Sequence, residues 1–205
     1  IVTLTGSASA FYLGLDSFLG ELPILLFTLI GGVVADRRDR RHMMITSQVV
    51  QMTVAFVLAA LVFTETVQIW MVLVLSSITG LAQAFGGPAY QSLVPTLVPK
   101  EHLPNAVALN SIQFNLARVI GPIVAGTALA AFGMVACFGL NGISFLFVIS
   151  AILALRNIHV PTAATSNMLE QMKDGLRYVR NSRNLMSVTA LGFIGAFLGL
   201  PLLTF

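Results

Sequence analysis

Three ionisable side chains stand inside long apolar runs of this sequence, and they are the residues that could do chemistry there. Asp16 and Glu21 lie in the run 10–35, and Arg118 lies in the run 106–132. An ionised carboxylate is costly in such surroundings, so it can take up or release a proton as water reaches it from one side or the other. Glu21 lies near the middle of its run and is the candidate proton carrier, whereas Asp16 lies nearer one end.

Arg118 lies on a polar stripe of an otherwise apolar run. At about 100° per residue, Ser111, Asn115 and Pro122 fall within about 60° of it around a helix. Its guanidinium could bind an anionic substrate group or hold a proton-carrying carboxylate, or it could simply lock two helices together. Asp16 fits a structural partner of Arg118, or a residue at a helix end, better than it fits a proton carrier.

A third group of charges follows the first apolar run, where residues 31–41 read Gly-Gly-Val-Val-Ala-Asp-Arg-Arg-Asp-Arg-Arg. Its aspartate could lie against the positive N-terminus of a helix in an opposing bundle, while its arginines reach carboxylates or helix C-termini. Such contacts would close the cytoplasmic side in one conformational state. Ordinary anchoring by basic residues would not need glycine and aspartate at set positions, so the spacing favours a gate. The gate residues are Gly32, Asp36, Arg37, Arg40 and Arg41.

The elements that must position these residues are membrane-spanning helices. The chain of 205 residues is 57% hydrophobic and 9% charged, with a mean hydropathy of +0.90, and a soluble protein of this composition could not cover its surface with polar atoms. About 20 helical residues cross the hydrocarbon core. Runs of that length predict six spans, at 10–35, 43–63, 69–94, 106–132, 135–155 and 185–205.

The basic residues predict which side these helices face. Ten of the eleven Lys and Arg residues fall in or beside alternate loops, and the opposite loops contain neither type. Short loops rich in Lys and Arg stay on the cytoplasmic side. The ten are Arg37, Arg38, Arg40, Arg41, Lys100, Arg156, Lys173, Arg177, Arg180 and Arg183.

The same residues exclude several classes of function. The net charge of +3 comes from the loop bias, so it does not indicate binding to nucleic acid. Cys137 is the single cysteine and has no His or Cys nearby, so no metal site and no cofactor are expected. No nucleophile, base and orienting group occur together, so we do not expect an enzyme.

The runs group into three segments. Residues 1–156 form a first bundle, 157–184 a polar cytoplasmic linker, and 185–205 the beginning of a second bundle. Within the linker, apolar residues recur at spacings of three and four, which predicts an amphipathic helix on the membrane surface or packed on the bundle ends. In the run 69–94, Ser76, Gly80, Ala84 and Pro88 are four apart, which predicts close helix packing. Both chain ends have the character of a fragment.

The join at 32–41 resembles the signature of the major facilitator superfamily, Gly-x-x-x-Asp-Arg-x-Gly-Arg-Arg, with Asp39 in place of the second glycine. The segment Gly121, Pro122, Ala125 and Gly126 resembles the Gly-Pro-x-x-Gly-Gly signature of antiporters. Ser76 stands where many drug antiporters have arginine. Longer stretches, from Pro-Ala-Tyr-Gln-Ser-Leu-Val-Pro to Gly-Leu-Arg-Tyr-Val-Arg, are similar to the branch of enterobactin exporters and macrolide-efflux proteins.

This resemblance implies an all-α, polytopic major facilitator bundle in a bacterial inner membrane, of which the chain covers helices two to seven of about twelve. It implies a monomer that exchanges protons for a bulky small molecule, such as a siderophore or macrolide, by alternating access. Glu21 would exchange protons, Arg118 with Asn115 and Ser111 would line the cavity, and Gly121, Pro122 and Gly126 would shape the fifth helix. Import by symport, and a non-transporting sensor or gene remnant, stay open as alternatives.

Overall fold

The computed structural model describes residues 9–155, 173, 177–182, 185–192 and 194. The chain divides into two compact units between Ala163 and Ala164. In the second unit, residues 177–181 and 185–192 are helical. Most of the predicted amphipathic linker helix and of the span 185–205 lies outside the described residues. The division into 1–156, 157–184 and 185–205 therefore stays a prediction.

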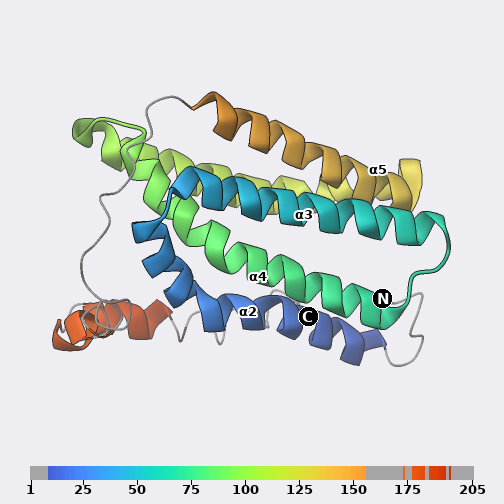
Figure 1. Ribbon diagram of the computed structural model, residues 1–205, viewed down its shortest axis with the longest axis horizontal. Helices are drawn as coiled ribbons and strands as arrows, with labels where there is room; N and C mark the ends of the chain where they lie inside the picture. The colour runs from blue at the N-terminus through green and yellow to red at the C-terminus, as the bar shows by residue number, and fades with distance from the viewer. Residues whose placement is uncertain (1–8, 156–172, 174–176, 183–184, 193, 195–205) are drawn as a thin grey trace. The chain divides into compact units, whose positions relative to one another are not determined.

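Every regular element in the described part of the first unit is a helix, which confirms the all-α prediction. Four of these helices are long and apolar enough to cross a membrane. Figure 1 shows the long helices side by side. In chain order the elements are α2 (Ser9–Arg37), α3 (Arg40–Phe63), α4 (Ile69–Leu93), the 3₁₀ turns η2 (Val94–Thr96) and η3 (Lys100–His102), and α5 (Leu103–Ala154).

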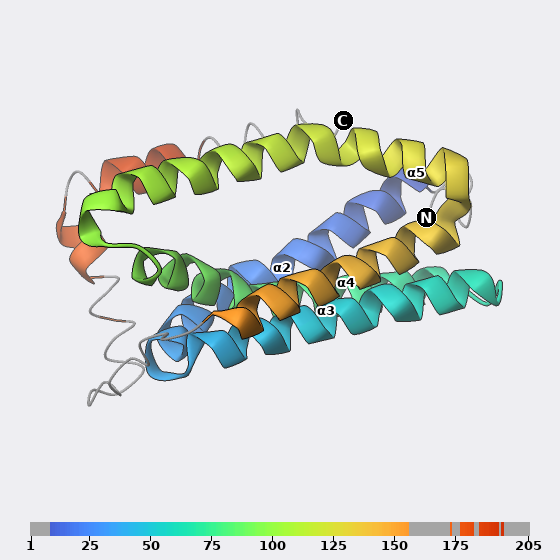
Figure 2. The same ribbon diagram turned by 90° about the horizontal axis from the view of Figure 1, so that it is seen from above.

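α5 is two spans joined by a sharp turn at Gly133. A straight helix of 52 residues would be about 80 Å long, far beyond the ~30 Å hydrocarbon core. Gly133 has φ 75° and ψ 176°, a conformation open almost exclusively to glycine. In Figure 2 the yellow-green first half of α5 reaches a turn, and the orange second half runs back from it and diverges from the first half. The separate runs predicted at 106–132 and 135–155 are therefore both present.

The helix α3 begins three residues before the predicted run at 43. Asp39 has an extended backbone, and its side chain accepts a hydrogen bond from the backbone N–H of Arg41, 2.9 Å away. A carboxylate in this position satisfies one of the N–H groups that the first helical turn leaves without a partner. The first turn of α3 can thus contain charged residues that a search for apolar runs leaves out.

Small residues let α2 and α4 approach each other closely. A Cβ on Gly80 would lie 2.0 Å from the carbonyl oxygen of Gly20, and a Cβ on Gly31 would lie 2.2 Å from that of Ala84. Glycine is therefore required at both crossings, because any larger side chain would overlap the facing backbone. α4 also packs against α3, and α3 packs against α5. The four-residue repeat of small residues on α4 serves helix packing, as predicted.

A small apolar cluster ties the four helices together at one end. Its members come from the last turns of α2, α4 and α5 and from the first turns of α3, so the helices alternate in direction and their basic joins share this end. Burial of this cluster fixes the backbone on which the join between α2 and α3 is built. The buried members are Ala35, Met44, Ala89, Leu93 and Ile152.

Candidate functional site

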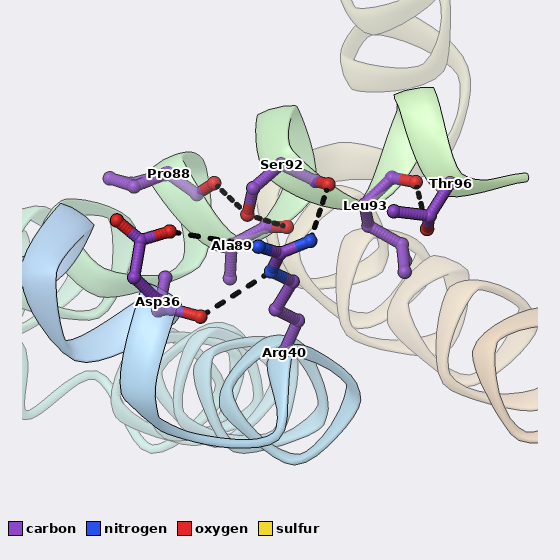
Figure 3. A network of polar contacts seen from close by, with 8 residues as sticks. Asp36, Arg40, Pro88, Ala89, Ser92, Leu93 and Thr96 are labelled. Carbon is purple, nitrogen blue, oxygen red and sulfur yellow. Dashed lines mark hydrogen bonds and ion pairs between the residues drawn. The ribbon is translucent and has the colours of Figure 1, made fainter. Parts of the chain in front are cut away.

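The basic join, residues 36–42, is held to the end of α4 by Arg40. The guanidinium Nη1 donates to the carbonyl oxygen of Ser92 at 3.0 Å, and Nε donates to that of Ala35 at 3.4 Å. Its Nη2 lies 3.6 Å from the Asp36 carboxylate. Figure 3 shows the guanidinium between Asp36 and the main chain at Ser92. The Arg40 side chain is 17% exposed, so these bonds are sheltered from water.

Arg41 makes a matching contact with the second half of α5, where its Nη2 donates to the carbonyl oxygen of Leu153. Both acceptors, Ser92 and Leu153, lie one residue before the ends of their helices. The last carbonyls of a helix have no partner within it and carry the negative end of its dipole. Two adjacent arginines of one join therefore neutralise two helix C-termini, and they fasten α3 to both α4 and α5.

Asp39 and His42 complete the join. The imidazole Nδ1 lies 2.6 Å from Oδ2 of Asp39, while Oδ1 accepts from the Arg41 backbone. Partial burial acts to raise the pKa of Asp39, but the hydrogen bonds from His42 and the Arg41 N–H outweigh it and hold the pKa below its ordinary value. Both carboxylate oxygens are thus occupied in the ionised form that caps α3.

The other predicted gate residues lie in different surroundings. Asp36 is 64% exposed, so its ion pair with Arg40 contributes little to stability, and the carboxylate is open to a further partner. Arg37 is partly buried. A Cβ on Gly32 would meet no atom within 4 Å, whereas Gly31 is the glycine in close contact with α4.

The carboxylates of α2 separate into one that is bonded and one that is open. Ser76 on α4 donates its hydroxyl to Oδ1 of Asp16 at 2.5 Å, so the hydroxyl that stands in place of the antiporter arginine is the partner of this aspartate. Glu21 is exposed, and it makes no side-chain hydrogen bond or ion pair within the described residues. The interpretation of Asp16 as a structural residue is consistent with this geometry, although its partner is Ser76 and not Arg118.

The polar stripe on the first half of α5 faces outward from the described part of the bundle. Arg118 is exposed, and its guanidinium carbon lies 6.0 Å from the ring centre of Phe114. Asn115 donates to the Ser111 carbonyl at 2.8 Å, and the Ser111 hydroxyl donates to that of Val107. The remaining members of the predicted set are exposed: α5 continues through Pro122, and Gly121 and Gly126 have open space at their Cβ positions.

Further polar contacts between helices have no counterpart in the sequence analysis. The buried Ser47 donates to the Ala82 carbonyl at 2.7 Å, beside Gly86, whose Cβ position lies 2.3 Å from the Ser47 hydroxyl oxygen. Tyr90 donates to the amide oxygen of Asn110 at 2.5 Å. The paired glycines at 86–87 were a signal for close approach, but nothing in the sequence identifies the partner hydroxyl. Across the described residues there is no cluster of metal-binding side chains.

The family model described as transmembrane secretion effector, of the major facilitator type, matches residues 3–203. The match thus includes the basic join, both carboxylates of α2 and the polar stripe of α5.

Individual relatives extend this likeness to named transporters. Macrolide efflux protein A of Streptococcus pyogenes is 25% identical over 205 residues, which are 96% of this chain and 49% of that protein. The multidrug efflux pump Tap of Mycolicibacterium fortuitum is 28% identical over 213 residues, 98% of this chain and 51% of the pump. The enterobactin exporter EntS of Shigella boydii is 25% identical over 185 residues, 90% and 44% respectively. The chain spans about half the length of the curated relatives it matches.

Proposed function

This chain belongs to the transmembrane secretion effector family of the major facilitator superfamily, and on that premise we propose that it is part of a proton-coupled exporter of a bulky small molecule. The substrate class is a siderophore or a macrolide-like compound, in keeping with the named activities of its relatives. The chemistry is translocation by alternating access, with no covalent change in the substrate. We place the protein in a bacterial inner membrane as a monomer.

The observation that carries this proposal is the pair of arginine contacts at the basic join. Arg40 and Arg41 bind helix C-termini through main-chain oxygens, while the Asp36 carboxylate beside them is largely exposed. An exposed carboxylate next to these arginine contacts can bind a helix N-terminus or a basic residue of a second bundle in one conformational state. In the other state it can release that partner. The join is thus the cytoplasmic gate of the proposed cycle.

Proton exchange is assigned to Glu21. It lies on an apolar spanning helix, it is exposed, and it has no partner within the described residues to hold it in its charged form. Asp16, by contrast, is bonded to Ser76, which fits a role in holding α2 against α4. A proton-exchanging carboxylate takes up a proton from one side of the membrane and releases it to the other. This requires that water reach it from each side in turn, and it does not require a fixed ion-pair partner.

Substrate contact is assigned to the stripe of Arg118, Asn115 and Ser111. Asn115 and Ser111 each donate a hydrogen bond to a carbonyl of their own helix. The charged Arg118 guanidinium is therefore the group of the stripe best suited to bind a substrate. An arginine at this depth must face water or a polar partner, because exposure to lipid would cost about 2.5–3.5 kcal/mol or more. Gly121, Pro122 and Gly126 follow it and shape the helix on the same run.

The test is proton movement in inverted membrane vesicles that contain the full-length protein. An acid-inside gradient is imposed, and macrolides and catecholate siderophores are added outside one class at a time. Export in exchange for protons predicts that one class discharges the gradient, and that vesicles with the Glu21→Gln variant do not respond. Absence of discharge by either class, from protein shown to be inserted and folded, would contradict the proposed coupling or substrate class.

A further inference from the structure

An open cleft of about 800 Å³ lies between α2, α3 and α4 beside the basic join. Its size falls within the ~300–1,000 Å³ range of small-molecule sites. Arg38 and His42 line the end of the cleft nearest the join, and Val50, Ile78 and Leu81 line the end farther along the helices. One end is therefore cationic and polar, and the other end is apolar. A molecule that fills this cleft must have the same two parts.

The charge at the end nearest the join belongs to Arg38. Asp39 also lines the cleft, but both of its oxygens are bonded, one to the Arg41 N–H and the other to His42. Arg40 and Arg41 point to helix C-termini. Arg38 is exposed and has no side-chain hydrogen bond or ion pair within the described part of the chain. The join as a whole carries four arginines against two aspartates, so it attracts anions.

The length of the cleft matches one leaflet of a bilayer. On α3 its lining runs from His42 to Val50, about 12 Å of helix at ~1.5 Å per residue. One leaflet contributes about half of the ~30 Å hydrocarbon core. Ile78 and Leu81 are 38% and 42% exposed although they lie in a spanning helix, so the apolar end is accessible to a hydrocarbon chain.

We propose that this cleft binds an anionic phospholipid of the leaflet on the basic side of the membrane, with its phosphate on Arg38 and an acyl chain against Leu81 and Ile78. Basic pockets between spanning helices are suited to acidic headgroups, because charge and hydrophobic contact act on the same molecule. The bound lipid would lie against α2, α3 and α4 beside the join, so it would bias the gate by stabilising this arrangement of the helices.

The test uses the delipidated full-length protein in detergent, titrated with phosphatidylglycerol or phosphatidylcholine and read by native mass spectrometry. The wild type should retain one phosphatidylglycerol in preference to phosphatidylcholine. Arg38→Gln should bind phosphatidylglycerol about tenfold more weakly, the loss expected for one charged hydrogen bond. Lys100→Gln is the matched control, since it removes an exposed positive charge away from the cleft and should bind like the wild type.

A second variant tests the apolar end. Leu81→Trp fills the apolar end of the cleft without changing its charge, so it should weaken the binding of both lipids. Free phosphate would still fit beside Arg38 in this variant. A loss of binding therefore indicates that the ligand is a lipid and not phosphate alone. Equal binding of both lipids by the wild type, or equal behaviour of Arg38→Gln and Lys100→Gln, would overturn the proposal. Since the readout is lipid binding, its failure would leave the transport proposal standing.

Discussion

At the scale of single residues, the arginines of the join are distinguished by what they bind. Arg40 is largely buried and holds the end of α4, Arg41 holds the end of α5, and Arg38 is exposed. The sequence places all of them at the cytoplasmic side with equal weight, because the positive-inside pattern counts charges and not contacts. Which arginine is structural depends on its acceptor, a carbonyl group at a helix end. These acceptors lie 52 and 112 residues away along the chain.

Arg40→Ala should destabilise the full-length protein by about 1.5–3 kcal/mol, the usual range for a hydrogen bond to a charged group whose partner is left buried. The part-buried Ser92 carbonyl would lose its donor. Thermal unfolding in detergent measures the effect, with Lys100→Ala as a control at an exposed position. Equal melting temperatures for the two variants would mean that the contact with Ser92 does not hold the join.

Glu21→Gln should abolish proton-coupled export while the amount of inserted protein stays near that of the wild type. The amide is close in size to the carboxyl group but cannot carry a proton through the cycle. Gradient discharge in vesicles measures coupling, and Glu101→Gln changes an exposed carboxylate outside the long helices as a control. Undiminished discharge by the Glu21 variant would remove this residue from the mechanism.

Asp39 predicts a dependence of stability on pH. Its pKa is lowered in the folded protein, so its ionised form contributes stability above the ordinary value of 3.8, and this contribution is lost as the pH falls through the lowered folded value. Asn also caps helices but does not ionise. The wild type should therefore be more stable than Asp39→Asn at neutral pH, and the difference should shrink below about pH 4. A difference that grows with acidity would contradict this assignment.

At the scale of elements, the helix bounds were predictable and their packing was only partly so. The observed α4, Ile69–Leu93, ends within one residue of the predicted run, because charged residues and turns end a spanning helix wherever water begins. The four-residue repeat also predicted a close-packed face on α4. The helix that meets that face, and the glycine at the crossing, were not predictable. Gly14 and Gly20 both follow a leucine on α2, but of the two it is Gly20 that opposes Gly80.

Gly80→Ala should lower stability by about 1–3 kcal/mol, because the added methyl group forces α2 and α4 apart. Gly14→Ala lies on α2 with open space at its Cβ position, and alanine favours helix formation there. The thermal midpoint of each full-length variant gives the comparison. A Gly80 variant as stable as the Gly14 variant would show that the crossing is looser than described.

At the scale of the whole molecule, the distribution of basic residues agrees with the alternating directions of the helices. The join 36–42 and the ends of α4 and α5 meet at the basic end, while the turn between α3 and α4, which contains Glu65, lies at the opposite end. The membrane class and the family could be predicted from composition and motifs. The side of the membrane that each end faces stays a prediction.

Single cysteines test this orientation. In a full-length protein from which all native cysteines, Cys137 included, have been replaced by serine, Glu65→Cys should react with an impermeant maleimide added to intact cells. Lys100→Cys should react only after the cells are opened, because it lies on the basic side. The reverse pattern would invert the topology and with it the proposed direction of export.

The use of main-chain oxygens by Arg40 and Arg41 has an evolutionary consequence. Any residue at position 92 or 153 supplies the same carbonyl, so substitutions there leave the acceptor in place. The two ends of each contact therefore need not change together as sequences diverge. Methods that infer contacts from correlated substitutions should therefore not detect these two arginine contacts, even in a large collection of homologues.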